Sequence, residues 1–150
     1  MIKLLKFYFR YYAFRSLRKV KNIENVIQTH GFRIYTFRLE APNDPVTKLI
    51  DQLDIFEYAE HHICFIATNE IMKGVFIKHN LSDDDRLELL FHEEAHIWYN
   101  HPNVTGFTED TETQQEMVAN GFLLKLKCFR RWLVVIAIGL VIGMLYCLLK

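Results

Sequence analysis

The C-terminal stretch from Trp132 to Leu149 (WLVVIAIGLVIGMLYCLL) contains 18 consecutive residues without a charged side chain. A helix needs roughly 17 to 25 such residues to cross the hydrocarbon core of a bilayer. A helix in a soluble core usually keeps a polar face, and this stretch has none. It predicts a transmembrane anchor over residues 129–150. Gly139 and Gly143 form a GxxxG pair inside it, which leaves a homodimer as an option.

Charge is strongly segregated along the chain, although the formal net charge is zero. Residues 1–21 carry seven basic residues and no acid, and residues 125–150 carry five and no acid. Residues 22–124 hold all eighteen acids against six basic residues. More basic residues precede the anchor than follow it, so the positive-inside rule places the body in the cytoplasm. The acidic body argues against nucleic acid as a direct partner and favours a basic protein.

The N-terminal arm, residues 1–21, is basic and amphipathic. Lys6 and Arg10 interrupt any apolar signal region, so the arm is expected to be retained. Two interpretations remain open. The arm can form a helix that lies on an anionic membrane surface, or it can form a first helix packed on the domain.

The remaining body, residues 22–128, has the length of one compact domain. The chain has three cysteines, Cys64, Cys128 and Cys147, which form no CxxC pair; this fits a reducing compartment and argues against a disulfide framework, so we expect them to be packing residues. Hydrophobic spacing predicts helices over 22–30 and 46–59, and strands over 32–39, 63–67 and 75–77. Two further helices are expected, one capped by Ser82 and running to Asn100, the other starting near Thr111. We expect an α+β fold in which about three antiparallel strands pack on these two helices.

The segment FHEEAHIWYN, residues 91–100, lies on the first of those two helices. His92 and His96 are four residues apart, so their imidazoles project about 40° apart and can meet one ion. Glu93 flanks the same position. In an H-E-x-x-H arrangement the histidines bind Zn²⁺, and the glutamate takes a proton from water that the metal has acidified. The motif therefore predicts a zinc site with Glu93 as the general base.

A candidate for the third zinc ligand is Glu116, which lies in the segment QEMVANGF on the second helix. Asn120 follows four residues later on the same face and is expected to orient a ligand histidine. Glu112, one turn earlier, is another candidate. His101 is a further one, although it falls one residue short of the longer H-E-x-x-H-x-x-G-x-x-H spacing. Glu116 is the favoured ligand.

The block from Gly74 to Phe122 resembles the ImmA/IrrE family of metallopeptidases, through its strand, H-E-x-x-H, a further histidine and E-x-x-A-N-x-F. The resemblance covers about a third of the chain strongly and residues 22–73 more loosely. It implies a small zincin domain of bacteria, phages and mobile elements that cleaves or inactivates helix-turn-helix repressors. It also implies the site residues His92, His96 and Glu116 as zinc ligands, with Glu93 as base.

The chain departs from the family pattern in three places. Glu94 and Ala95 replace the usual leucine and glycine of the motif, a basic segment and anchor follow the second helix, and no helix-turn-helix region is recognisable. A membrane-held peptidase need not act on a soluble repressor. The expected function is a membrane-anchored, cytoplasm-facing zinc metallopeptidase with a protein substrate, in which Tyr99 or His101 could assist the transition state. The alternatives are a non-catalytic zinc-binding regulator that binds a repressor, and an interaction protein without metal.

Glu94 projects into the apolar stripe of its helix, beside Leu90 and Ile97. An unpaired carboxylate buried there would be costly. We therefore expect a Lys or Arg partner, with the basic N-terminal arm as the nearest source.

Overall fold

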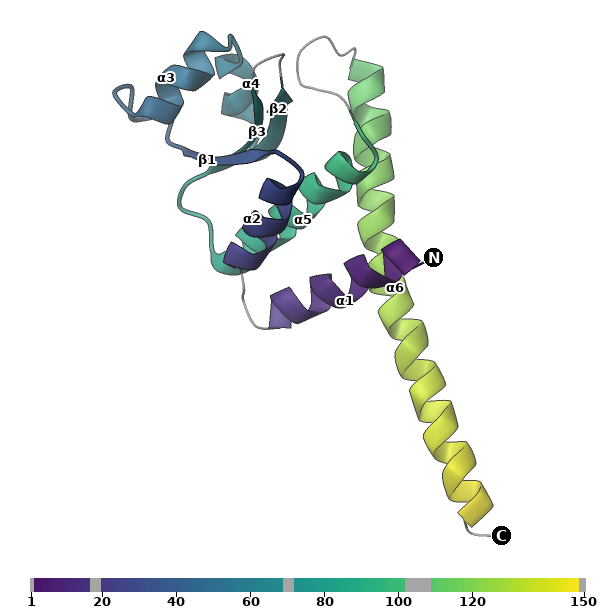
Figure 1. Cartoon of the computed structure of the whole chain (residues 1–150). Coiled ribbons are helices and arrows are strands. Elements are labelled where there is room, and N and C mark those ends of the chain that lie inside the picture. The colour runs from purple at the N-terminus through teal and green to yellow at the C-terminus, as the bar shows by residue number, and fades with distance from the viewer. Residues whose placement is uncertain (1, 17–19, 69–71, 102–108, 149–150) are drawn as a thin grey trace.

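The computed structural model describes residues 2–16, 20–68, 72–101 and 109–148, which form an α+β structure with a three-stranded sheet (Figure 1). Helices α3 and α4 cover one face of the sheet, whereas α2 and α5 cover the other. The elements in chain order are α1 (Ile2–Ser16), α2 (Val20–Thr29), β1 (Arg33–Phe37), α3 (Pro45–Gln52), α4 (Phe56–His61), β2 (Cys64–Thr68), β3 (Lys73–Lys78), α5 (Asp83–Trp98) and α6 (Glu109–Leu148).

The sheet has the strand order β1-β3-β2 and is mixed. Strands β2 and β3 form the expected antiparallel hairpin, with Cys64 opposite Ile77. Strand β1 pairs with β3 in parallel, with Arg33 opposite Gly74, so the expectation of a wholly antiparallel sheet is wrong. The alternation of apolar residues identifies a strand but carries no information about the direction of its neighbour. That direction follows from the long connection through α3, α4 and β2, which returns the chain to β1 in parallel.

The strands alternate between two buried faces, as the two-residue period of a strand requires. Val75 and Ile77 face α2 and α5, where they join the larger hydrophobic cluster. Phe76, between them, faces α3 and α4 and packs with Phe37 and Phe65. The sheet thus has helices on both sides, and α5 is held between the sheet and α1.

The region predicted as one helix over 46–59 forms two. Asp44 caps α3 by accepting hydrogen bonds from the backbone of Val46 and Thr47 at 3.0 and 3.2 Å, and Pro45 occupies the first turn. The helix ends at Gln52 with Leu53 as its C-cap, and Asp54 takes a left-handed conformation with φ 56°. Hydrophobic spacing continues across this break, so the spacing alone could not reveal it.

Helix α1 belongs to the domain core. Phe7 and Tyr11 are buried, and their rings lie 5.6 and 4.8 Å from the ring of Phe91 on α5. Phe7 also packs on Phe122 of α6 at 4.9 Å. Of the two interpretations of the basic arm, a first helix packed on the domain is confirmed.

Helix α6 is a single continuous element of 40 residues, about 60 Å long at 1.5 Å per residue. Ala119, Phe122 and Leu123 pack it on the domain, and its C-terminal half extends away from the domain (Figure 1). Within Gln115–Leu148 an 18-residue window has a mean hydropathy of 2.2 and is not buried, so this helix is long and apolar enough to cross a membrane. Leu149 lies outside the described residues.

Candidate metal centre

The local sequence fixes where α5 begins and ends. Ser82 accepts a hydrogen bond from the backbone of Asp85 at 3.2 Å, and three aspartates occupy the first turn, where the helix dipole favours negative charge. The helix ends at Trp98, and Asn100 follows with φ 53°. This register turns His92 and His96 toward α6.

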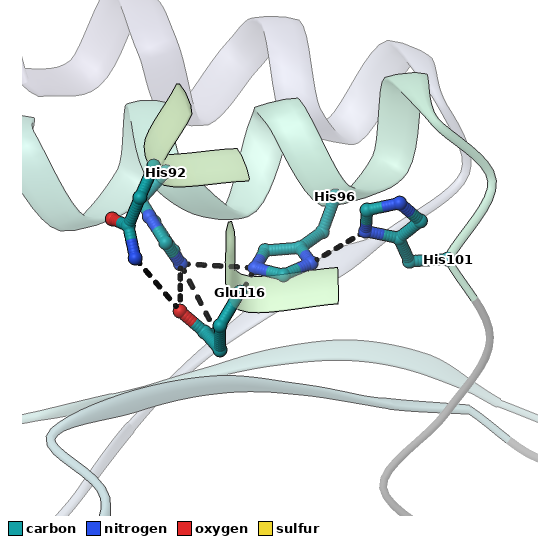
Figure 2. Close-up of polar contacts among 5 residues, drawn as sticks. His92, His96, His101 and Glu116 are labelled. Carbon is teal, nitrogen blue, oxygen red and sulfur yellow. Dashed lines mark hydrogen bonds and ion pairs between the residues drawn. The ribbon is translucent and has the colours of Figure 1, made fainter. Parts of the chain in front are cut away.

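The donor atoms of His92, His96 and Glu116 converge on one point. The two histidine Nε2 atoms lie 2.9 Å apart, and the Glu116 carboxylate oxygens lie 3.1 Å from His92 Nε2 and 3.2 Å from His96 Nε2. Zinc bonds of 2.0–2.1 Å at tetrahedral angles place neighbouring ligand atoms roughly 3.3 Å apart. Figure 2 shows Glu116 facing both imidazoles. These residues therefore form a cluster that can hold a metal ion.

Electrostatic interactions within the cluster shift the pKa values of Glu116 and His92 toward their charged forms. Hydrogen bonds from His92 and His96 hold the pKa of Glu116 well below its usual range. Burial by itself lowers the pKa of His92, but the hydrogen bond to Glu116 and the charges of Glu93 and Glu116 raise it above its ordinary value overall. Two imidazoles beside a carboxylate that stays ionised are donor groups able to hold a metal ion.

His101 lies behind His96, on the side away from His92 (Figure 2). Its Nδ1 atom is 2.9 Å from Nδ1 of His96, and burial together with the charge of His96 lowers the pKa of His101. A neutral His101 can accept a hydrogen bond from the Nδ1–H group of His96, which leaves His96 Nε2 free to bind metal. Tyr99 is about half exposed and stacks on His101. Neither residue lines the cleft described below, so their placement favours orientation of His96 over direct help to a transition state.

Asn120 contacts the glutamate of the cluster. Its Nδ2 atom lies 3.5 Å from Oε2 of Glu116, one turn away on α6, whereas the sequence suggested that it would orient a histidine. It can therefore steady the carboxylate. The side chain of Glu112, the other acidic candidate, lies outside the described part of the chain.

Glu93 is buried, with 4% of its surface exposed, and lies beside the two histidines. Burial raises its pKa, and the charges of His96 and His92 partly offset that rise. The side chain of Cys64 on β2 lies beside Glu93, and burial together with the charge of Glu93 raises the pKa of the Cys64 thiol, so the thiol stays protonated. Cys64 was expected to be a packing residue, because its sequence neighbours give no sign of the contact.

A cleft of about 710 Å³ opens beside the cluster, between the end of α4, β2, α5 and α6. Glu88, four residues before His92, lines it and is bound by Lys127 at 2.7 Å and by Tyr11 at 2.9 Å. The four-residue spacing to His92 was the available sequence signal for Glu88. The remaining lining residues include His61 and His62.

Glu94 is fully buried and pairs with Arg10 of α1, as the sequence predicted. The Arg10 guanidinium also lies over the Phe7 ring, 5.3 Å from its centroid. Burial lowers the pKa of Arg10. The second glutamate of the HEEAH motif thus joins α1 to α5 on the side opposite the metal cluster.

Comparisons with protein-family models, with curated proteins and with solved structures find no match to this chain. The class of protein is therefore defined by its own structure. It is an α+β domain that carries a His-His-Glu cluster able to bind a metal, joined to a long apolar helix.

Proposed function

We propose that this chain is a zinc-dependent peptidase held at the cytoplasmic face of a membrane by α6. The observation that carries the proposal is the convergence of the donor atoms of His92, His96 and Glu116, with the carboxylate of Glu93 buried beside them. Two imidazoles and one glutamate are a donor set of zinc peptidases. The H-E-x-x-H spacing and the resemblance to ImmA/IrrE metallopeptidases point to the same chemistry.

His92, His96 and Glu116 would hold Zn²⁺, which when bound supplies a Lewis acid that acidifies water and polarises a peptide carbonyl. The Glu93 carboxylate accepts the proton of the attacking water and donates it to the departing amine. Burial raises the pKa of Glu93, which makes its carboxylate a stronger proton acceptor than an exposed one. His101 and Asn120 hold His96 and Glu116 in place.

Location follows from the charge around α6. Lys125, Lys127 and Arg131 precede the apolar span and Lys150 follows it, which favours a cytoplasmic domain. A cytoplasmic protein substrate then reaches the cleft directly. The family resemblance suggests a helix-turn-helix repressor, and the excess of acids in residues 22–124 favours a basic substrate surface.

The substitution Glu93→Gln tests catalysis separately from metal binding. The amide has nearly the same shape but cannot accept the proton, so we expect zinc content to stay at one equivalent while peptide hydrolysis falls by at least about 100-fold. Zinc is measured by elemental analysis, and hydrolysis by mass spectrometry of a peptide library. Asp51→Asn, an exposed carboxylate on α3, is the matched control and should leave both unchanged.

A non-catalytic zinc-binding regulator is the second candidate. It is favoured by the protonated thiol of Cys64 beside Glu93, because a donor at this carboxylate competes with the water that a peptidase must activate. In that case the wild-type protein would hold zinc and cleave no peptide, and Glu93→Gln would leave binding of a repressor intact. Absence of bound zinc in the wild-type protein would exclude both candidate functions.

A further inference from the structure

Helix α1 has an inward and an outward face. Phe7 and Tyr11 are buried against the domain, whereas Leu5 is 42% and Phe9 is 61% exposed. At 100° per residue Leu5 and Phe9 lie about 160° and 200° from Phe7, so they share the side opposite the core. Lys6 is exposed on the edge of that side. Packing on the domain therefore accounts for only one face of an amphipathic helix.

The position of α1 along α6 is fixed by an aromatic contact. The ring of Tyr8 packs edge-on against the ring of Phe129 on α6, with centroids 5.0 Å apart. Phe129 precedes Trp132, where the uncharged span begins, by three residues or about 4.5 Å along the helix axis. The headgroup region of each leaflet is roughly 5–7 Å thick. A membrane spanned by α6 would therefore place α1 at headgroup depth.

The arrangement of the helices agrees with this depth. Helix α1 crosses α6 on the side of the domain from which the C-terminal half of α6 extends (Figure 1). Its inward face contacts α5 through Phe91 and α6 through Phe122. The outward face, with Leu5 and Phe9, is on the opposite side of the helix.

The charge at this level is positive. Residues 1–21 and 125–131 contain no acid, and the exposed cations Lys6, Lys125 and Arg131 belong to these segments. Cations beside a membrane surface bind anionic phospholipid headgroups. Apolar side chains flanked by cations are the pattern of helices that lie in the interface plane.

We propose that the outward face of α1, formed by Leu5, Lys6 and Phe9, lies in the headgroup layer of an anionic bilayer. The inference rests on the anchoring by α6 that belongs to the proposed function. It adds a second attachment, so the domain is held at a fixed height and orientation on the membrane. Because Arg10 of the same helix pairs with Glu94, the attachment reaches the metal-bearing helix through one side-chain contact.

Tryptophan quenching by nitroxide-labelled lipids tests the proposal in the full chain, reconstituted in bilayers of phosphatidylcholine with about 30% phosphatidylglycerol. The chain has two tryptophans, Trp98 and Trp132. Trp98→Phe leaves Trp132 as a reporter of the anchor. In a Trp98→Phe, Trp132→Phe background, Phe9→Trp reports on the outward face. Lys48→Trp, at an exposed position of α3, is the matched control. We expect at least threefold stronger quenching at position 9 than at position 48.

The outcomes separate this proposal from the anchor itself. Quenching of Trp132 with none at position 9, repeated with Leu5→Trp, would overturn the interfacial helix and leave the anchor in place. A blue-shifted but unquenched residue at position 9 would mean that another protein copy covers the face, which also overturns it. Absence of quenching at Trp132 would overturn the membrane location of both proposals while zinc binding stayed intact.

The preference of this face for anionic lipid is tested by changing the lipid composition and by changing the charge of residue 6. Quenching at position 9 should fall at least twofold when phosphatidylglycerol is omitted, and also when Lys6→Glu is added in the anionic bilayer. Lys48→Glu, the same change on α3, should leave it unaffected. Equal quenching in neutral and anionic bilayers would overturn the assignment to anionic lipid.

Discussion

The two helices that supply the candidate ligands differ in how the molecule holds them. Leu90, Phe91 and Ala95 of α5 are completely buried, and the side chains of its ligand histidines are 15% and 11% exposed. Glu116 of α6 is 47% exposed, and beyond Phe129, which packs on Tyr8 of α1, this helix leaves the domain (Figure 1). The site thus combines a half fixed in the core with a half carried by the anchor helix.

The candidate ligands are therefore held by different parts of the molecule. The two histidines are kept together by one turn of a packed helix, so their spacing survives as long as α5 does. Glu116 reaches them across a helix interface, about 24 Å along α6 from Trp132, where the apolar span begins. We therefore expect the effects of substitution to be larger on α5 than on α6.

The largest effect is expected from His96→Ala. It removes a buried donor of the cluster, and we expect metal affinity to fall on the order of 1,000-fold, beyond the 10- to 100-fold loss typical of a supporting residue. Zinc affinity is measured by competition with a chelator. His30→Ala, exposed beyond the end of α2, should bind zinc like the wild type. Unchanged affinity in His96→Ala would exclude this cluster as the metal site.

Arg10→Ala tests the packed side of α5. It leaves the fully buried Glu94 carboxylate without its cation, and we expect the free energy of unfolding to fall by about 3 kcal/mol. Urea unfolding in detergent micelles, followed by tryptophan fluorescence, measures the change. Lys6→Ala on the same helix is the control and should have no measurable effect. Equal stability of the two variants would mean that the ion pair does not hold α1 on α5.

Glu116→Ala tests the half of the site on α6. Because this carboxylate is half exposed, water can take its place, and we expect metal affinity to fall by about 10- to 100-fold. Affinity is measured by the same chelator competition, and Glu57→Ala, at an exposed position of α4, is the control. A loss as large as that of His96→Ala would show that both halves of the site contribute equally.

The smallest effect is expected from pH in the metal-free protein. The pKa of Glu116 is depressed, so its stabilisation is present above the unfolded value of about 4.5 and is lost as pH falls through the folded pKa. The pKa of His92 is raised, so its stabilisation is present below about 6.5 and is lost as pH rises through the folded pKa. Their attraction is therefore greatest between about pH 4.5 and 6.5. The difference in Tm between wild type and Glu116→Gln should peak in that window, and a difference independent of pH would contradict it.

Much of the site was predictable because its chemistry is local. His92, Glu93 and His96 lie within five residues on one helix, so helical geometry alone places them together. The burial of Glu94 and its need for a cation followed from the same geometry. Asn120 was assigned to a histidine, although its contact is to Glu116 one turn away on the same helix. The place of Cys64 beside Glu93 was missed because it depends on how separate elements pack. The parallel pairing of β1 with β3 was missed for the same reason.

The sequence by itself determined the local features: the ligand-bearing helix, the apolar span, the hairpin and the segregation of charge, since each depends on residues a few positions apart. The tertiary structure decided which distant groups meet. It brought Glu116 to the histidines, Cys64 to Glu93, Arg10 to Glu94 and His101 to His96. Such meetings depend on the packing of several elements at once, and hydrophobic spacing specifies which face of a helix is buried but not what it is buried against.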